Sequence, residues 1–367
     1  MTSIRLPDPV VRRPEQPYVD VAALQRDLRE RVDGEMRFDP GSRGAYSTDA
    51  SNYRQVPIGV VVPRTVDAGA EAVTVCRRHG APVVSRGGGT SLAGQSCNVA
   101  VVIDWSKYCH QVVSVDAAAR TCVVEPGIVL DELNAQLADQ GLMFGPRPAT
   151  RDHCTLGGMI GNNSCGATAQ VSGKTVDNVL ALEVLTYADE RFWAGPTSDE
   201  EYARIAAGDG PQRQLYEALR ELAERHADMV RERYPQIPRR VSGYNLDSLL
   251  PENGFDVGRA LVGSESTLVT ILRCGWSRCR PPGLWSCGPK RGDGPCPIKM
   301  TTRAPANSSP TAGRRCPRWQ RRYRTAGGAT FTSMRPRQSS AAEPGAHHWC
   351  WSASSRVMPR TARARPS

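Results

Sequence analysis

The sequence has little of what membrane-spanning, exported or metal-binding proteins need. No apolar run reaches the ~20 residues with which a helix crosses a bilayer, so we expect no membrane span. The first residues, MTSIRLPDPVVRRPEQ, have no apolar stretch typical of a secretory signal, and we expect a cytoplasmic protein. The six cysteines of residues 1–272 lack the paired spacing of metal sites, which favours reduced, buried thiols and no metal ion.

The end of the chain is nearly devoid of the side chains that form a core. Residues 273–367 contain only three Val, Ile or Leu residues, which are Leu284, Ile298 and Val357. The same segment has 12 prolines, five of the seven tryptophans and a net charge of +17, whereas residues 1–272 carry −7. A segment of this composition cannot bury enough apolar surface to fold, so we expect a poorly folded tail.

Two interpretations of this tail stay open. A change to Arg, Pro, Ser, Gly, Cys and Trp is typical of a GC-rich gene read out of frame, and we favour this hypothesis. Alternatively, a basic tail interleaved with Trp319, Tyr323, Trp349 and Trp351 binds nucleic acid or anionic lipid, because bases stack on aromatic rings. The tail cysteines fit neither ferredoxin nor zinc-ribbon spacing, which excludes an iron–sulfur cluster.

Residues 1–272 alternate buried strands with amphipathic helices, a pattern that predicts a fold of mixed α and β structure. Apolar runs predict strands over 58–62, 82–84, 99–104, 111–115, 121–124, 179–187 and 269–272. Apolar residues at helical spacing predict helices over 21–32, 66–78, 129–140 and 211–234. In the last helix we expect a buried stripe of Leu215, Leu219, Leu222 and Met229.

The most informative stretch is Ser85–Gln95, SRGGGTSLAGQ, which follows a short apolar strand. Consecutive glycines at 87–89 allow positive φ and let main-chain N–H groups converge into an anion-binding nest. The hydroxyls of Thr90 and Ser91 and the charge of Arg86 suit the same role. The alternative is a flexible glycine loop without a ligand.

Three motifs in order carry a family resemblance. They are RGGGTSLAGQ at 86–95, TLGGMIGNNSCG at 155–166 and GSESTL at 263–268. The chain resembles the FAD-binding domain of the vanillyl-alcohol-oxidase/p-cresol-methylhydroxylase type. Within it, the chain is most similar to the FAD-linked oxidases that comprise D-lactate dehydrogenase, D-2-hydroxyglutarate dehydrogenase and the flavin-binding part of glycolate oxidase. The segment YSTDASNYRQVPIGVVVPR at 46–64 also resembles the start of that domain.

The resemblance implies an α+β fold and a domain organisation. Residues 45–272 would form a two-subdomain FAD-binding domain, preceded by an N-terminal arm and helix at 1–44. The tail, 273–367, would stand where the family has its substrate cap, as a disordered or out-of-frame segment.

The resemblance also implies the residues that hold FAD. The main chain of 87–91 would hold the diphosphate, the 148–164 segment would line the ribityl chain and ring, and 265–267 would close the adenine or diphosphate side. The implied residues are Arg86, Gly87, Gly88, Gly89, Thr90, Ser91, Gln95, Pro148, Ala149, Thr150, Thr155, Leu156, Gly157, Gly158, Asn162, Asn163, Ser164, Glu265, Ser266 and Thr267. Some relatives attach FAD through a histidine where this chain has Thr90, so we expect non-covalent FAD. The family usually has glycine at the position of Ser266.

The implied activity is oxidation of a 2-hydroxy acid of the D-lactate, glycolate or 2-hydroxyglutarate class. A quinone, cytochrome or iron–sulfur partner would accept the electrons, and we expect no nucleic-acid partner. No catalytic residue is assigned, and without a recognisable cap we expect FAD binding with poor turnover. The alternatives are a non-catalytic FAD-binding module and the basic-tail nucleic-acid binder.

One polar run just before the third motif has two interpretations. Arg239, Arg240, Tyr244 and Asn245 could reach a substrate carboxylate, because Arg binds carboxylates through two parallel hydrogen bonds. The alternative is a basic surface with a helix cap.

Overall fold

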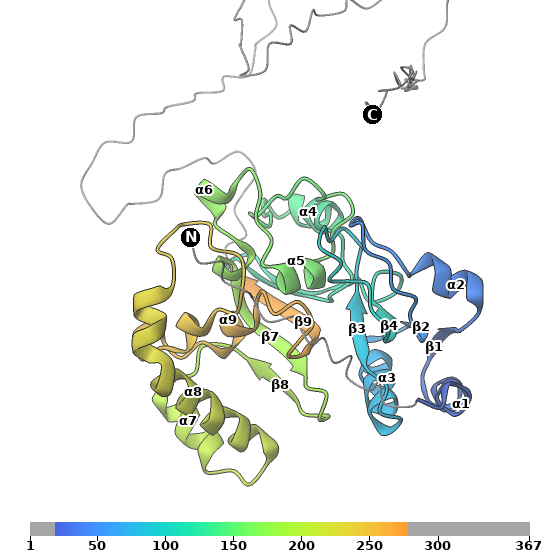
Figure 1. Cartoon of the computed structure of the whole chain (residues 1–367). Coiled ribbons are helices and arrows are strands. Elements are labelled where there is room, and N and C mark those ends of the chain that lie inside the picture. The colour runs from blue at the N-terminus through green and yellow to red at the C-terminus, as the bar shows by residue number, and fades with distance from the viewer. Residues whose placement is uncertain (1–18, 278–367) are drawn as a thin grey trace, which may run out of the picture. The chain divides into compact units, whose positions relative to one another are not determined.

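The computed structural model describes residues 19–277 and shows two β-sheets with helices packed on both (Figure 1). The predicted α+β fold with two subdomains is therefore confirmed, whereas the predicted tail lies outside the described residues from residue 278 onward. Helix α8 is 23 residues long. Neither α8 nor any other helix within residues 19–277 is both long and apolar enough to cross a membrane.

The elements of the first subdomain come first in the chain. They are α1 (Val21–Arg31), β1 (Gly34–Arg37), α2 (Pro40–Ala45), β2 (Gly59–Pro63), α3 (Val66–Arg78), β3 (Val83–Arg86) and β4 (Val101–Asp104). The remaining elements are β5 (Val112–Asp116), β6 (Thr121–Val124), α4 (Leu130–Ala138), α5 (Leu156–Asn162), α6 (Ala169–Ser172), η1 (Thr175–Asp177), β7 (Val179–Leu185), β8 (Arg191–Ala194), α7 (Asp199–Ala206), α8 (Pro211–Arg233), η2 (Leu246–Leu249), η3 (Pro251–Asn253), α9 (Val257–Leu261) and β9 (Thr270–Ser277).

The first sheet has the order β1-β2-β4-β3, with β2, β4 and β3 parallel and β1 antiparallel at the edge. Every residue of β2 is buried, because both faces of the sheet are covered. Val61 and Ile103 pack with α1 and α3 on one face, and Val60 and Val102 belong to a smaller apolar cluster. The carboxyl ends of β3 and β4 therefore lie at the same edge, where the glycine loop begins.

The segment before residue 45 is part of this subdomain. Leu24 and Leu28 of α1 are fully buried in its core, and Asp20 caps α1 by accepting hydrogen bonds from two main-chain N–H groups. Strand β1 pairs with β2 over four residues. The predicted boundary at residue 45 therefore does not separate a structural unit.

The second sheet has the order β5-β6-β9-β7-β8, and all its pairs are antiparallel. The last strand in sequence thus lies in the middle of the sheet. It continues past the predicted end at Leu272, since Cys274 and Trp276 pair with β6 and are buried. The ordered fold therefore extends five residues into the predicted tail, to Ser277.

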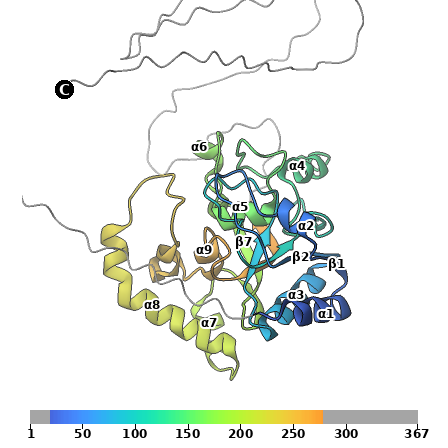
Figure 2. The ribbon, with the colours of Figure 1, turned by 45° about the vertical axis from the view of Figure 1, so that its right-hand side comes forward.

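Helices α7 and α8 lie on the side of the molecule away from α1 and α3 (Figures 1 and 2). Helix α8 buries Tyr216, Ala223 and Val230, seven residues apart, whereas Met229 is 51% exposed. The predicted stripe is therefore only partly right: Leu219 packs against the core, but the buried positions are one residue further along, because Tyr216 packs edge-on against Phe192 and Phe255.

Candidate cofactor site

A cavity of about 440 Å³ opens where the loop after β3, helix α5 with its preceding loop, and the turn before β9 meet. This volume lies in the range of roughly 300–1,000 Å³ that is usual for small-molecule sites. The structure thus brings all three sequence motifs to one place. The predicted residues that line the cavity are Arg86, Gly87, Gly88, Gly89, Thr90, Ser91, Gln95, Pro148, Ala149, Thr150, Thr155, Gly157, Gly158, Asn162, Asn163, Ser164, Glu265 and Ser266.

Two of the predicted residues do not line it. Leu156 is fully buried and packs in the core of the second subdomain, where the first apolar residue of α5 must point. The Thr267 hydroxyl donates to the Ser264 carbonyl over 2.6 Å and so stabilises the turn instead.

Other lining residues had not been predicted. They are Ser85, Leu92, Ala93, Ser96, Trp105, Pro126, Cys154, Met159, Gly161, Cys165, Val241, Ser264, Val269 and Ile271. Most of these residues lie within or beside the three motifs, so they could have been predicted by including the neighbours of each motif. Trp105, Pro126 and Val241 come from other segments and carry no local signal.

The glycine loop is held against the second motif by main-chain contact. A β-carbon on Gly87 would overlap the Thr155 hydroxyl, and one on Gly88 would overlap the His153 carbonyl oxygen. Gly89 has φ +63°, in the left-handed region that favours glycine, and its carbonyl accepts a hydrogen bond from Ala50 N over 3.0 Å. The glycine triplet therefore forms a fixed loop.

The Arg86 guanidinium is held beside this loop by neutral groups only. It donates to the main-chain carbonyls of Thr48, over 2.9 Å, and Ser96, over 3.2 Å, and lies 5.7 Å from the centre of the Tyr46 ring. Within residues 19–277 no carboxylate forms an ion pair with it. Its positive charge is thus available to an anionic ligand in the cavity.

Two buried donors in the cavity wall have no hydrogen-bond partner. Asn163 ends α5 with φ +50°, and its Oδ1 accepts from Val176 N over 3.1 Å, whereas its Nδ2 is unpartnered. The indole Nε1 of Trp105 is unpartnered as well. Both nitrogen atoms have almost no accessible surface, so they lie behind the cavity wall and do not face the open cavity.

The third motif forms a strained turn across the cavity. Glu265 and Ser266 have φ +49° and +62°, a left-handed backbone that non-glycine residues seldom adopt. Gln95 Nε2 of the glycine loop donates to Glu265 Oε1 over 3.3 Å, which connects the first and third motifs. Burial raises the pKa of Glu265, which is the one carboxylate among the described residues that line the cavity.

The cavity wall contains few other ionisable side chains. Besides Arg86 and Glu265, the ionisable side chains that line the cavity are Cys154 and Cys165. Burial raises the pKa of Cys154, so this thiol stays protonated at neutral pH. Within residues 19–277 no three His, Cys, Asp or Glu side chains stand close enough together to hold a metal ion.

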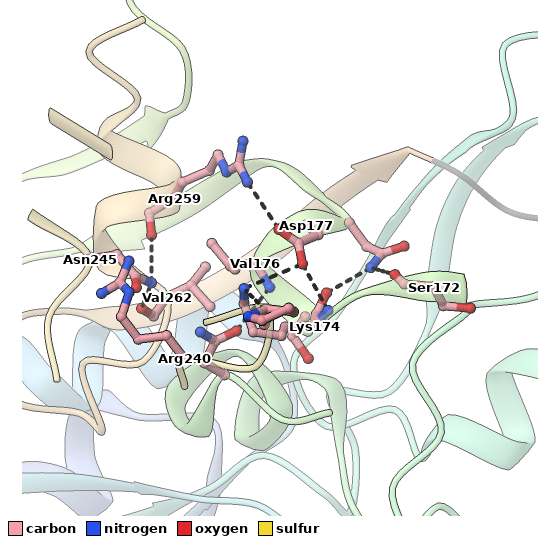
Figure 3. Close-up of polar contacts among 12 residues, drawn as sticks. Ser172, Lys174, Val176, Asp177, Arg240, Asn245, Arg259 and Val262 are labelled. Carbon is pink, nitrogen blue, oxygen red and sulfur yellow. Dashed lines mark hydrogen bonds and ion pairs between the residues drawn. The ribbon is translucent and has the colours of Figure 1, made fainter. Parts of the chain in front are cut away.

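The four residues considered for carboxylate binding in the sequence analysis have different contacts in the structure. Asn245 is buried and donates to the carbonyls of Val262, over 2.7 Å, and Arg259, over 3.3 Å, so it stabilises the end of α9 (Figure 3). Arg240 forms an ion pair with Asp247 over 2.6 Å. The Tyr244 hydroxyl lies 2.9 Å from the Thr267 hydroxyl, while the Arg239 guanidinium contacts the Cys165 sulfur at 3.1 Å. Arg239 alone of the four contacts a residue of the cavity wall.

Residues 57–194 match the family described as "FAD binding domain". This match includes the glycine loop and all of α5. Residues 57–194 of the chain are thus similar to an FAD-binding domain. FAD is the cofactor that this match indicates.

Three curated relatives share this FAD-binding domain. A D-2-hydroxyglutarate dehydrogenase of Pseudomonas putida is 32% identical over 243 residues, which are 65% of this chain and 24% of that protein. Glycolate oxidase subunit GlcD of Bacillus subtilis is 32% identical over 169 residues, 44% of this chain and 36% of that protein. The D-lactate dehydrogenase [cytochrome] 1, mitochondrial, of Saccharomyces cerevisiae is 28% identical over 159 residues, 42% of this chain and 26% of that protein. The chain thus matches about a quarter to a third of these relatives' length.

Proposed function

We propose that FAD binds non-covalently in the cavity formed by the three motifs. The observation that carries this proposal is the convergence of these motifs, far apart in sequence, on one cavity, together with Arg86, which has no carboxylate partner within residues 19–277. The main-chain N–H groups of 87–91 and the Arg86 charge would hold the diphosphate. Thr90 has no side-chain nitrogen for a covalent bond to the flavin.

We propose that the chain derives from an FAD-dependent oxidoreductase that oxidises a 2-hydroxy acid to a 2-oxo acid. Bound FAD would supply the acceptor for two electrons and the hydrogen on C2. The relatives named above support this substrate class, and one of them is named as a cytochrome-linked dehydrogenase, which supports a cytochrome among the possible acceptors. The described residues of this chain bind and orient the cofactor, and none of them is assigned as a base.

We propose that residues 19–277 together form the FAD-binding domain, since α1 packs in the core of the first subdomain and β1 pairs with β2. The tail beyond residue 277 would stand in place of a substrate cap. A cytoplasmic location is supported by the buried free thiols of Cys76, Cys97, Cys109 and Cys154, which are typical of a reducing compartment.

The absorption spectrum of the purified full chain tests the cofactor. We expect flavin bands, about one FAD per chain, and release of all the flavin when the protein is precipitated with acid. A colourless protein that also fails to take up added FAD would contradict the proposal.

A second candidate function is an FAD-binding module without turnover, since none of the described residues that line the cavity is assigned as a catalytic base. Anaerobic addition of D-lactate, glycolate or D-2-hydroxyglutarate to the FAD-loaded chain distinguishes the two. Bleaching of the flavin band supports the dehydrogenase, whereas an unchanged spectrum supports the module.

A further inference from the structure

A second hollow lies beside the cofactor cavity. It has a volume of about 370 Å³ and is formed by one stretch of chain, Tyr234–Tyr244, which connects α8 to η2. Val241 lines both this hollow and the cofactor cavity, so the two adjoin. Ile237 and Tyr244 give the hollow a partly apolar, exposed wall, with 59% and 41% of their surfaces accessible.

The carboxylates around this hollow are already occupied by other cations. Asp247 pairs with Arg240, whose guanidinium also lies 4.6 Å from the centre of the Tyr234 ring. Asp177 is shared by Lys174, at 3.6 Å, and Arg259, at 3.2 Å (Figure 3). The Lys174 ammonium also donates to the Pro238 carbonyl, which belongs to the stretch of chain that forms the hollow.

Arg239 differs from these cations. It lines the hollow, and within residues 19–277 it has no carboxylate partner. Its Nη2 contacts the Cys165 sulfur, a weak acceptor, and Cys165 lines the cofactor cavity. The exposed Arg239 guanidinium thus lies where the hollow and the cofactor cavity adjoin, and within residues 19–277 its one hydrogen-bond contact is with the Cys165 sulfur.

We propose that this hollow binds the carboxylate of a small 2-hydroxy acid and that Arg239 is the residue that binds it. The proposal rests on the proposed function, since it places an anionic substrate next to the cofactor cavity. A guanidinium matches the two oxygens of a carboxylate with two parallel hydrogen bonds. The apolar wall suits the carbon chain of the acid. The diphosphate has a separate cation in Arg86, beside the glycine loop.

The test uses the full chain loaded with FAD and titrated with oxalate, a carboxylate that cannot be oxidised as a 2-hydroxy acid. Binding beside the flavin shifts its absorption bands, and we expect a saturable difference spectrum. Arg239→Gln should weaken oxalate binding about tenfold or more, because a charged hydrogen-bonded pair is lost, and Arg239→Lys should retain part of the affinity. Arg29→Gln, an equal change of charge on α1, is the matched control and should bind oxalate as the unaltered chain does.

The FAD content of every variant is measured in parallel. Equal oxalate affinity in Arg239→Gln and the unaltered chain overturns the proposal, and so does the absence of any saturable oxalate binding. Loss of FAD from Arg239→Gln, with oxalate binding retained, would assign Arg239 to the cofactor phosphates and also overturn it. If the unaltered chain takes up no FAD, the proposed function fails. Calorimetric titration of oxalate into the FAD-free chain and Arg239→Gln then tests the carboxylate site by itself.

Discussion

Gly88 packs against His153 so closely that a β-carbon on Gly88 would overlap the His153 carbonyl oxygen. The contact joins the glycine loop of the first subdomain to the loop that begins α5. Gly88 is therefore needed for the approach of two main-chain segments as well as for any contact with a diphosphate. Neither segment can move away easily, because Thr155 is buried against Gly87 at the same place.

We expect Gly88→Ala to separate these two loops. The added methyl group should destabilise the fold by about 1–3 kcal/mol, as overpacking does, and lower the FAD content. Gly44→Ala is the control, because a β-carbon there meets no atom within 4 Å and replaces glycine inside helix α2. The control should be neutral or up to about 1 kcal/mol more stable. Urea unfolding and the flavin absorbance per chain measure both effects, and equal behaviour of the two variants would contradict the expectation.

Ser266 occupies a left-handed backbone conformation in the turn before β9, with φ +62°. Glycine adopts this conformation without the steric cost that a β-carbon brings, so Ser266→Gly should stabilise the fold by about 1 kcal/mol. Ser242→Gly, at an exposed position without positive φ, should be neutral or slightly destabilising. The free energies of unfolding of both variants are measured in urea. If Ser266→Gly is less stable than the unaltered chain, the contacts of the serine side chain outweigh the steric cost of its left-handed backbone.

Trp276 is crowded in the core of the second subdomain. Its ring centre lies 3.5 Å from that of Phe144 at an interplanar angle of 74°, whereas aromatic pairs prefer roughly 4.5–7 Å. Its buried indole N–H has no partner, and such a group costs about 1–3 kcal/mol. Trp276→Phe removes the N–H and part of the volume, so we expect a gain of about 1 kcal/mol in stability.

The control for this variant is Trp193→Phe, because Trp193 is 48% exposed. This substitution should change the free energy of unfolding by no more than about 0.5 kcal/mol. Thermal and urea unfolding compare the two variants. A loss of about 2 kcal/mol in Trp276→Phe would mean that the indole fills its site well.

Glu265 should make stability depend on pH in the opposite direction to most carboxylates. Burial raises its folded pKa above the ordinary value of 4.5, so the folded state binds the proton more tightly than the unfolded state. Its contribution to stability is therefore full below pH 4.5 and is lost as the pH rises through the folded pKa. Glu265→Gln should melt at a higher temperature than the unaltered chain at pH 8, and the difference should shrink toward pH 4.

Glu252→Gln should change the pH dependence of stability in the opposite direction and serves as the comparison. Hydrogen bonds from Arg231 lower the pKa of Glu252 to about 2, so its contribution to stability is present above pH 4.5 and lost as the pH falls toward 2. This variant should melt at or below the temperature of the unaltered chain at pH 8. Melting curves from pH 4 to 8 that show the same trend for both variants would contradict this assignment.

Local features of the fold were predictable because their causes are local. Helix α3 begins and ends where predicted, at Val66 and Arg78, since Thr65 caps its first turn and Gly80 follows its end with φ +63°. Strand β6 matches its predicted residues, 121–124. The three motifs that line the cavity were found in the sequence through their resemblance to a known family of FAD-linked oxidases, and only the glycine triplet carried a physical signal of its own.

The sequence by itself determined helices α1, α3, α4 and α8 and most of the strands, because backbone preference and apolar periodicity act over a few residues; β1, β8, α2, α5, α7 and α9 were not predicted. Only the tertiary structure decided that β9 lies between β6 and β7, that Trp105 and Val241 reach the cavity, and that, among the described residues, Arg240 has a carboxylate partner while Arg239 has none. These features depend on contacts between residues far apart in the chain, and such contacts follow from how whole surfaces pack against one another.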